Sequence, residues 1–255
     1  MKRYIKSAVE SLSGYDWKTK YEIASDPETT SDVLEQLADS DSSVVTNAII
    51  GNDNVTADIL DKIADNILRF IGKDADILER IAQHPKVSKN TLAKIVTQGM
   101  DDLDESYRGC EVLIAVAENP NTSLMTLKRL SNCSDLDVRN AVAKNPNSSS
   151  AILRHMVRVD NSIIPYVLTN PNIPMELLLK LAKSTDHWTR EGVACNPSTP
   201  PEVLTSLASD ESYYVRESLA ENVNTPIDVL KQLANDDEWM VAESAKVTLR
   251  KLGVI

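Results

Sequence analysis

Four carboxylates lie within five residues of one another near the middle of the chain: Asp101, Asp102, Asp104 and Glu105. Clustered carboxylates could attract Ca²⁺, Mg²⁺ or a basic protein. The run lacks the twelve-residue spacing of a calcium loop and the glutamate that closes such a loop. We therefore expect a solvated acidic loop that would favour a basic protein partner, and we predict no metal site.

A second group of residues is mainly aromatic and lies towards the C-terminus: His187, Trp188, Tyr213, Tyr214, Trp239 and Met240. They form three pairs that follow one another at intervals of 26 residues. Tryptophan and tyrosine are enriched where proteins bind one another, but the same side chains could fill gaps between short helices. We expect the pairs in the turn between two helices, on one edge of the molecule, as candidates for partner binding.

Catalytic chemistry finds little support in the sequence. The histidines are His84, His155 and His187, and the three cysteines are widely spaced. The chain contains no HExxH, GxSxG, Walker or CxxC motif. We therefore predict that the protein is not an enzyme and has no catalytic residue, no cofactor and no metal.

The aromatic pairs recur because the sequence itself repeats. An Asn-Pro anchor returns every 25 or 26 residues at Pro120, Pro146, Pro171 and Pro197, and weaker copies extend the pattern to both ends. Leucine occupies the seventh position after the anchor in all eight copies, and we call these residues the column leucines: Leu34, Leu60, Leu92, Leu127, Leu153, Leu178, Leu204 and Leu230. Apolar residues spaced three and four apart predict one buried face of a helix.

Each copy is predicted to hold two short helices, such as residues 200–208 and 213–221. A Thr-Pro or Ser before the first helix supplies its N-cap, and the next Asn-Pro ends the second helix. The segment 17–25 resembles a second helix whose first helix is degenerate. No segment alternates with period two, so we expect essentially no strand.

Because two short helices bury little surface alone, neighbouring copies must stack. We predict an all-α fold, an α-solenoid built as a right-handed superhelix of about eight repeats of about 26 residues. Residues 1–255 are expected to form a single repeat domain. It comprises an N-terminal cap and degenerate repeat (1–25), irregular repeats with insertions (26–118), regular repeats (119–242) and a C-terminal cap (243–255).

Two polar columns accompany the apolar ones. Asparagine precedes the anchor at Asn119, Asn145, Asn170, Asn196 and Asn222, and follows it at Asn121, Asn147, Asn172 and Asn224. Asparagine side chains can mimic backbone turns, so we predict a structural ladder along the corner of the stack. Arginine recurs at Arg139, Arg190 and Arg216. Because Asp135 and Asp186 lie four residues earlier, we predict Asp–Arg pairs within or between repeats.

The segments 119–147 (NPNTSLMTLKRLSNCSDLDVRNAVAKNPN) and 196–222 (NPSTPPEVLTSLASDESYYVRESLAEN) resemble the variant leucine-rich repeat family, which is similar in style to HEAT and armadillo solenoids. The resemblance is close over residues 119–250 and loose over 17–118. It implies a helical superhelix in which α and 3₁₀ helices alternate, and it implies no single activity. Some members carry an iron–sulfur cluster on N-terminal cysteines, but the first cysteine here is Cys110.

The charge balance narrows the class of partner. The net charge is -11, with 22 acidic and 13 basic residues in 1–118 against 16 and 14 in 119–255. Nucleic-acid binding depends on lysine and arginine, so direct nucleic-acid binding is disfavoured. The longest apolar runs are far shorter than the roughly 18 residues of a membrane helix, and the N-terminus lacks the apolar region of a signal peptide. We expect a cytoplasmic protein without membrane contact.

These observations lead us to predict a non-enzymatic repeat scaffold that mediates protein–protein interaction through an extended surface. The sequence does not name the partner, for which a basic protein is one option, or the oligomeric state. Two alternatives stay open. One is a nucleic-acid-associated HEAT-like solenoid, and the other is an acidic decoy that occupies the basic site of a nucleic-acid-binding protein.

Overall fold

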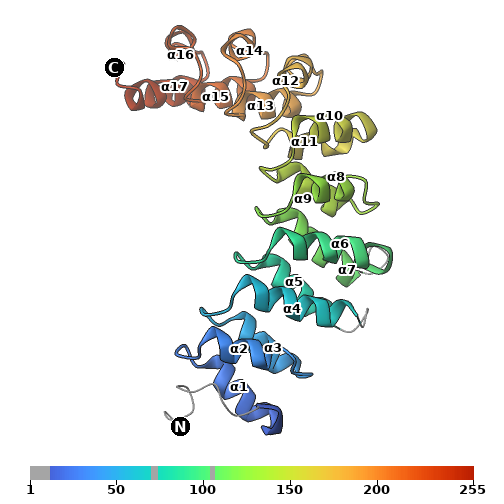
Figure 1. Cartoon of the computed structure of the whole chain (residues 1–255). Helices are drawn as coiled ribbons and strands as arrows, with labels where there is room; N and C mark the ends of the chain where they lie inside the picture. Colours follow the sequence, from blue (N-terminus) through green and yellow to red (C-terminus); the bar gives the residue numbers. More distant parts are fainter. Residues whose placement is uncertain (1–11, 70–73, 104–106) are drawn as a thin grey trace. The chain divides into compact units, whose positions relative to one another are not determined.

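The computed structural model describes residues 12–69, 74–103 and 107–255, without the side chains of residues 13, 98–103, 107 and 108. Residues 1–11 of the predicted N-terminal cap therefore lie outside the described residues. Every regular element in the described ranges is a helix (Figure 1). Contacts between Cα atoms divide the chain into two compact units, Met1–Val142 and Ala143–Ile255.

The first unit stacks helices in two layers. Its helices are η1 (Leu12–Gly14), α1 (Trp17–Ser25), α2 (Ser31–Leu37), α3 (Ser43–Ile50), α4 (Ala57–Leu68), α5 (Ala75–Gln83), α6 (Lys89–Leu103), α7 (Tyr107–Glu118) and α8 (Leu124–Leu130); α9 (Leu136–Lys144) spans the boundary between the units. One layer places α1, α3, α5 and α7 in successive contact, and the other places α4 against α6 and α6 against α8. The helix predicted at residues 17–25 is α1, and Asp16 caps it by accepting from Thr19 N at 2.8 Å.

The second unit repeats this arrangement. It contains α10 (Ser150–Val159), η2 (Asn161–Ile163), α11 (Ile164–Val167), α12 (Met175–Leu181), α13 (His187–Cys195), α14 (Pro201–Ser206), α15 (Tyr213–Glu221), α16 (Ile227–Leu233) and α17 (Trp239–Lys251). Helices α11, α13, α15 and α17 contact one another in order. Helices α12, α14 and α16 form a second row along one side of the first (Figure 1). We call the helices that carry the column leucines first helices (α2, α4, α6, α8, α10, α12, α14 and α16), and the helices that follow them second helices (α3, α5, α7, α9, α11, α13, α15 and α17).

The column leucines form the spine of the core. All eight of them are 0 % exposed. Full burial of a leucine side chain contributes about 1.5–3 kcal/mol, so one leucine per copy is a substantial and regularly spaced contribution. The predicted all-α solenoid of stacked helix pairs is thereby confirmed. Its handedness and its organisation as one domain stay predictions.

Three local expectations were wrong. The two helices of a pair do not alternate between α and 3₁₀, because first helices also close α-helical turns: Leu127 N donates to Ser123 O, and Leu230 N donates to Pro226 O. Among the described residues, 3₁₀ helix is confined to η1 and η2. The expected acidic loop was wrong at Asp101 and Asp102, which belong to α6. The insertions in the second and third copies lengthen first helices, since α4 has 12 residues and α6 has 15, against 7 in α8.

The third wrong expectation concerns the Thr-Pro caps. Ser123 and Ser149 do cap α8 and α10 through their side chains. In the Thr-Pro copies the N-cap residue is the proline, and it has no side-chain bond. The hydroxyl of Thr225 instead donates to Leu219 O at 2.7 Å, closing the open carbonyl end of the preceding helix. No helix in the described ranges combines the length and the apolar character needed to cross a membrane.

Candidate functional site

The asparagine before each anchor bonds its repeat to the one before. Asn222 Nδ2 donates to Ala194 O at 2.7 Å and to Asn196 O at 3.3 Å, while its Oδ1 accepts from Asn224 N at 2.9 Å. Asn52 makes the same pair of donations in the first unit, to Ala24 O and Asp26 O. Each such amide satisfies buried carbonyls that would otherwise cost free energy. The predicted structural ladder is confirmed.

The third copy keeps the ladder with different residues. His84 Nδ1 accepts from Lys86 N at 3.1 Å, as an asparagine Oδ1 does elsewhere. Lys86 Nζ donates to Asp53 O at 2.7 Å and to Val55 O at 3.0 Å, as the second asparagine does elsewhere. Burial, followed by the charge of Lys86, lowers the pKa of His84 and so favours the neutral ring that can accept. His84 is therefore a structural residue of the ladder.

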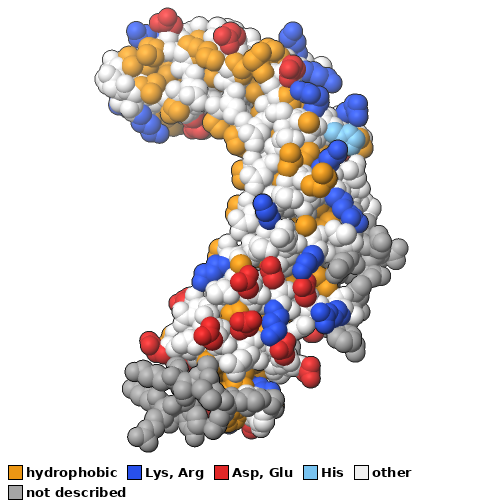
Figure 2. All heavy atoms as spheres, in the orientation of Figure 1, with side chains coloured by type: hydrophobic (Ala, Val, Ile, Leu, Met, Phe, Trp, Pro, Cys, Tyr) orange, Lys and Arg blue, Asp and Glu red, His pale blue; other side chains and the backbone are white. Residues whose placement is uncertain are grey.

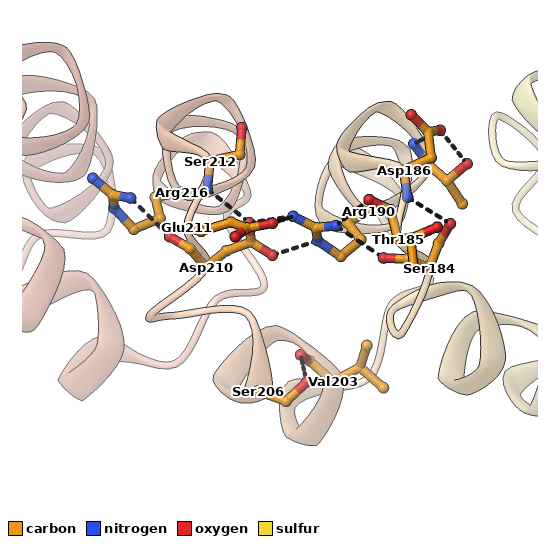
Figure 3. A network of polar contacts seen from close by, with 11 residues as sticks. Ser184, Thr185, Asp186, Arg190, Val203, Ser206, Asp210, Glu211, Ser212 and Arg216 are labelled. Atoms are coloured by element: carbon orange, nitrogen blue, oxygen red, sulfur yellow. Dashed lines mark hydrogen bonds and ion pairs between the residues drawn. The ribbon is translucent and has the colours of Figure 1, made fainter.

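A second ladder, of arginine and aspartate, runs through the second unit (Figure 3). Arg190 binds Asp210 in a two-pronged ion pair, with Nε–Oδ2 at 2.7 Å and Nη2–Oδ1 at 2.8 Å. Arg216 binds Asp236 in the same way, at 2.7 and 2.9 Å. Arg216 Nη1 also donates to Asp210 O at 2.7 Å, so the two pairs join into one network across three repeats.

The carboxylates of this ladder are held in their charged form. Burial acts to raise the pKa of Asp210, but the bonds from Arg190 and from Ser212 N–H outweigh it and lower the pKa. The bond from Arg216 lowers the pKa of Asp236. The side chains of Arg190 and Asp210 are only 8 and 6 % exposed. A paired charge so deeply buried is costly to break, because either partner alone would stay buried without compensation.

The predicted Asp–Arg pairing was right in kind but wrong in partner. Arginine pairs with the aspartate 20 residues later in the next repeat. Asp186, four residues before Arg190, instead accepts from Thr189 N at 2.9 Å and from the Thr189 hydroxyl at 2.7 Å. These two bonds, the hydroxyl first, lower the pKa of Asp186, which is the N-cap of α13. Asp135 likewise accepts from Val138 N.

The arginine–aspartate ladder fixes the chain where α13, α15 and α17 begin. The six aromatic-pair residues are the first two residues of these helices, so their predicted place in the inter-helix turn was wrong. Each of these helices starts at the first residue of a pair because the residue before it serves as the N-cap. We call the six residues the aromatic surface: His187, Trp188, Tyr213, Tyr214, Trp239 and Met240.

The rings of α13 and α15 form one cluster. Trp188 and Tyr214 are stacked with ring centroids 5.9 Å apart and planes inclined by 26°. His187 lies 4.7 Å from Trp188 and 6.1 Å from Tyr214, and Tyr213 lies 4.0 Å from Tyr214 between centroids. The structure thus brings together residues 26 positions apart in the sequence, as repeat stacking predicts.

Much of the aromatic surface remains open to solvent. Trp188 is 63 % exposed, Tyr214 is 42 % exposed and Trp239 is 74 % exposed. Met240, beside Trp239 on α17, is 42 % exposed. Only a minor part of the surface of the two indole side chains is therefore buried in gaps between helices. Figure 2 shows hydrophobic side chains gathered over the Ala143–Ile255 unit, with acidic side chains among them.

Two carboxylates that the sequence interpretation missed flank the rings. Glu191 and Glu217 lie four residues after His187 and Tyr213, one helical turn further along α13 and α15. Burial raises the pKa of Glu191, with a further contribution from Glu217 and an opposing one from His187. Glu191 Oε2 is buried and has no hydrogen-bond partner among the described residues. Glutamate recurs 20 residues after the anchor in three copies, and this column could have revealed them.

The pKa of Tyr213 is affected by neighbouring residues of the same surface. A hydrogen bond with the hydroxyl of Tyr214 raises the pKa of Tyr213 to about 12, and Glu217 and Glu238 act in the same direction. At neutral pH Tyr213 is therefore uncharged. The surface combines exposed rings with nearby carboxylates, a combination suited to attracting a cationic side chain.

The role of the acidic run as a partner site stays a prediction. Asp104 and Glu105 lie outside the described residues, and so do the side chains of Asp101 and Asp102. The backbone of Asp101 and Asp102 belongs to the last turn of α6. Among the described residues, no group of three or more histidine, cysteine, aspartate or glutamate side chains is arranged to hold a metal ion.

Comparison with known proteins supports the fold. No family model matches the chain, and no curated protein matches it. A solved structure described as "a leucine-rich repeat variant with a novel repetitive protein structural motif" is similar, with a TM-score of 0.53 and 17 % sequence identity over 86 % of this chain and 81 % of that one. At this identity the likeness concerns the fold. The suspected resemblance to variant leucine-rich repeat proteins is thereby confirmed for the architecture: the chain has the helical-repeat fold of such a protein.

Proposed function

We propose that the protein is a non-enzymatic scaffold that binds another protein through the aromatic surface on α13, α15 and α17. The observation that carries the proposal is the exposure of Trp188, Tyr214 and Trp239, each of which is one of the first two residues of a second helix in three successive repeats. Tryptophan and tyrosine dominate the binding energy of many interfaces because they bury a large apolar area and still offer a polar group.

The ion pairs that hold the helices carrying these side chains support the same proposal. The pairs Arg190–Asp210 and Arg216–Asp236 hold the starts of neighbouring helices together immediately beside the rings. A surface that is already ordered loses less conformational entropy when a partner binds. The carboxylates Glu191 and Glu217 beside the rings do not favour a nucleic acid, because its phosphates would be repelled.

The test is affinity capture from the native cell with the wild-type protein and with a Trp188→Ala, Tyr214→Ala, Trp239→Ala variant. We expect the variant to lose a protein that the wild type captures, while circular dichroism shows the same helix content. Met175, 56 % exposed on the first helix α12, supplies the matched control, and Met175→Ala should capture like the wild type. Identical capture by the wild type and the folded triple variant would rule out this surface as the binding site.

A further inference from the structure

We infer that the aromatic surface binds an arginine-rich segment of the partner, with a guanidinium group over the rings of Trp188 and Tyr214 and paired with Glu191. This inference rests on the proposed function, because it specifies the chemistry of the partner at the same surface. Three independent features of the second unit support it: the rings, the carboxylates and a cation–aromatic contact that the chain already makes.

The rings offer an attractive platform for a cation. Trp188 and Tyr214 are stacked and largely open to solvent, and the faces of aromatic rings carry negative electrostatic potential. Tryptophan is the most effective residue for such contacts. In the described part of the chain, no lysine or arginine of the protein itself is placed over a ring of the aromatic surface.

Among the described residues, the carboxylates Glu191 and Glu217 beside the rings form no ion pair with a lysine or arginine. Glu191 Oε2 is buried without a hydrogen-bond partner, so a turn of this side chain towards an incoming N–H donor would relieve a costly state. From Asp186 to Cys195, Asp210 to Glu221 and Asp236 to Ala245 the lysine and arginine residues are Arg190 and Arg216, and both are already committed to Asp210 and Asp236; His187 acts to lower the pKa of Glu191. Additional exposed carboxylates, Asp237 and Glu238, stand at the start of α17, whereas the exposed Glu211 pairs with Arg190 at 3.3 Å.

The chain itself uses this chemistry one repeat earlier. Lys144 Nζ lies 5.1 Å from the ring centroid of Tyr166 in α11, which packs against α13. Tyr166 stands 20 residues after its anchor, the same position that Glu191 occupies in its own repeat. A cation on this row of second helices is therefore compatible with the local backbone, and α13 and α15 present the rings and carboxylates without one.

Arginine fits these groups better than lysine does. Its planar guanidinium stacks on aromatic faces, is more weakly hydrated than an ammonium and offers a fork of N–H donors to a carboxylate. Glu191 lies one helical turn from the His187–Trp188 pair, so one guanidinium can meet a ring face and a carboxylate together. A lysine ammonium would gain the charge attraction but not the stacking.

The experiment is isothermal titration calorimetry of the full-length protein with a peptide in which arginine alternates with glycine and serine. We expect this peptide to bind, and we expect a copy with citrulline in place of arginine to bind at least about tenfold more weakly. A lysine copy should lie between them. Equal affinity for the citrulline copy, or tighter binding of the lysine copy, would overturn the inference.

Variants place the binding on the surface. Trp188→Ala and Glu191→Gln should each weaken the arginine peptide about five- to tenfold. Glu202→Gln removes one exposed carboxylate from the first helix α14 and should leave the affinity unchanged. Equal weakening by Glu191→Gln and Glu202→Gln would mean attraction by overall negative charge and would reject the site. Trp188→Tyr should restore part of the affinity lost in Trp188→Ala, provided that a ring face is what binds.

The two levels of the proposal fail in different ways. No binding of the arginine peptide, together with loss of the captured protein in the triple alanine variant, refutes the arginine chemistry and leaves the binding surface in place. No binding together with unchanged capture refutes both.

Discussion

The two units connect neighbouring repeats with ion pairs of different kinds. In the first unit, Lys62 on α4 pairs with Asp39 at 2.8 Å, and their side chains are 34 and 64 % exposed. Lys94 on α6 pairs with Asp65 at 2.7 Å and is similarly open to water. In the second unit, Arg190 and Asp210 are 8 and 6 % exposed and lie where second helices begin. The second unit also has an exposed pair, Arg154–Glu176 at 3.5 Å, but it adds two arginine–aspartate pairs that are built into its interior.

This difference accompanies a difference in what the second helices display. Helices α3 and α5 begin with Ser43–Val44 and Ala75–Asp76, whereas α13, α15 and α17 begin with the aromatic surface. An exposed lysine pair holds its partner loosely and adds little stability. A buried two-pronged arginine pair fixes both position and orientation. The buried pairs Arg190–Asp210 and Arg216–Asp236 therefore lie where large aromatic side chains are displayed to solvent.

Removing one arginine should give the largest contrast between the units. Arg190→Ala leaves the Asp210 carboxylate buried without its partner, and we expect a loss of about 3–5 kcal/mol from the free energy of unfolding. Lys62→Ala should lose less than about 1 kcal/mol because its pair is exposed. Urea unfolding followed by circular dichroism measures both. Similar losses in the two variants would contradict the contrast.

Substitution in the asparagine ladder should give a smaller contrast. Asn196→Ala removes donations to Leu168 O and Asn170 O and the acceptor for Ser198 N, so we expect a loss of about 2–3 kcal/mol. His84→Ala removes the acceptor for Lys86 N but leaves the donations of Lys86 Nζ, so about 1 kcal/mol should be lost. The same urea experiment compares them, and an equal or larger loss in His84→Ala would show that the third copy is not held as described.

Acidification should produce the mildest and most localised effect. The folded-state pKa values of Asp210 and Asp236 lie below the ordinary value of about 3.9, so the folded state binds fewer protons than the unfolded state. Their stabilisation is fully present above about pH 5 and is lost as the pH falls through the folded-state values.

Hydrogen exchange at about pH 6 and at about pH 3, corrected for the intrinsic exchange rate, tests this sign. Protection should fall more in α13 and α15 than in α4, although the bond from Lys62 also lowers the pKa of Asp39, because that pair is exposed and screened by water. A uniform fall across both units would argue against a special role of the buried pairs.

Periodicity predicted the elements that depend on one copy at a time. The helices at 17–25 and 213–221 have the predicted bounds. The column leucines are buried as their spacing required. These features follow from local rules, since an apolar face must be buried and proline stops a helix whatever its neighbours do.

The features that depend on how neighbouring copies stack could not be predicted from the periodicity of the sequence. The partner of Arg190 is 20 residues away, a distance set by the offset between neighbouring repeats rather than by helical periodicity. The hydroxyl of Thr225 was expected to cap the helix after it but bonds to the helix before it. Glu191 escaped notice because its significance arises only when burial and the neighbouring rings are known.

The asparagine ladder gives the array a polarity. The amides of Asn52, Asn119, Asn170, Asn196 and Asn222 donate to carbonyls of the copy that precedes each of them, so these copies depend on their predecessors for acceptors. A cut at a repeat boundary would therefore be asymmetric: the piece on the N-terminal side would expose carbonyls to water, whereas the piece on the C-terminal side would begin with donors that have lost their acceptors. Because Lys86 Nζ donates to the same two carbonyl positions of the preceding copy as the second asparagine does, a copy of unlike sequence can still join the array, which is a property that a chain needs to lengthen or shorten by whole repeats.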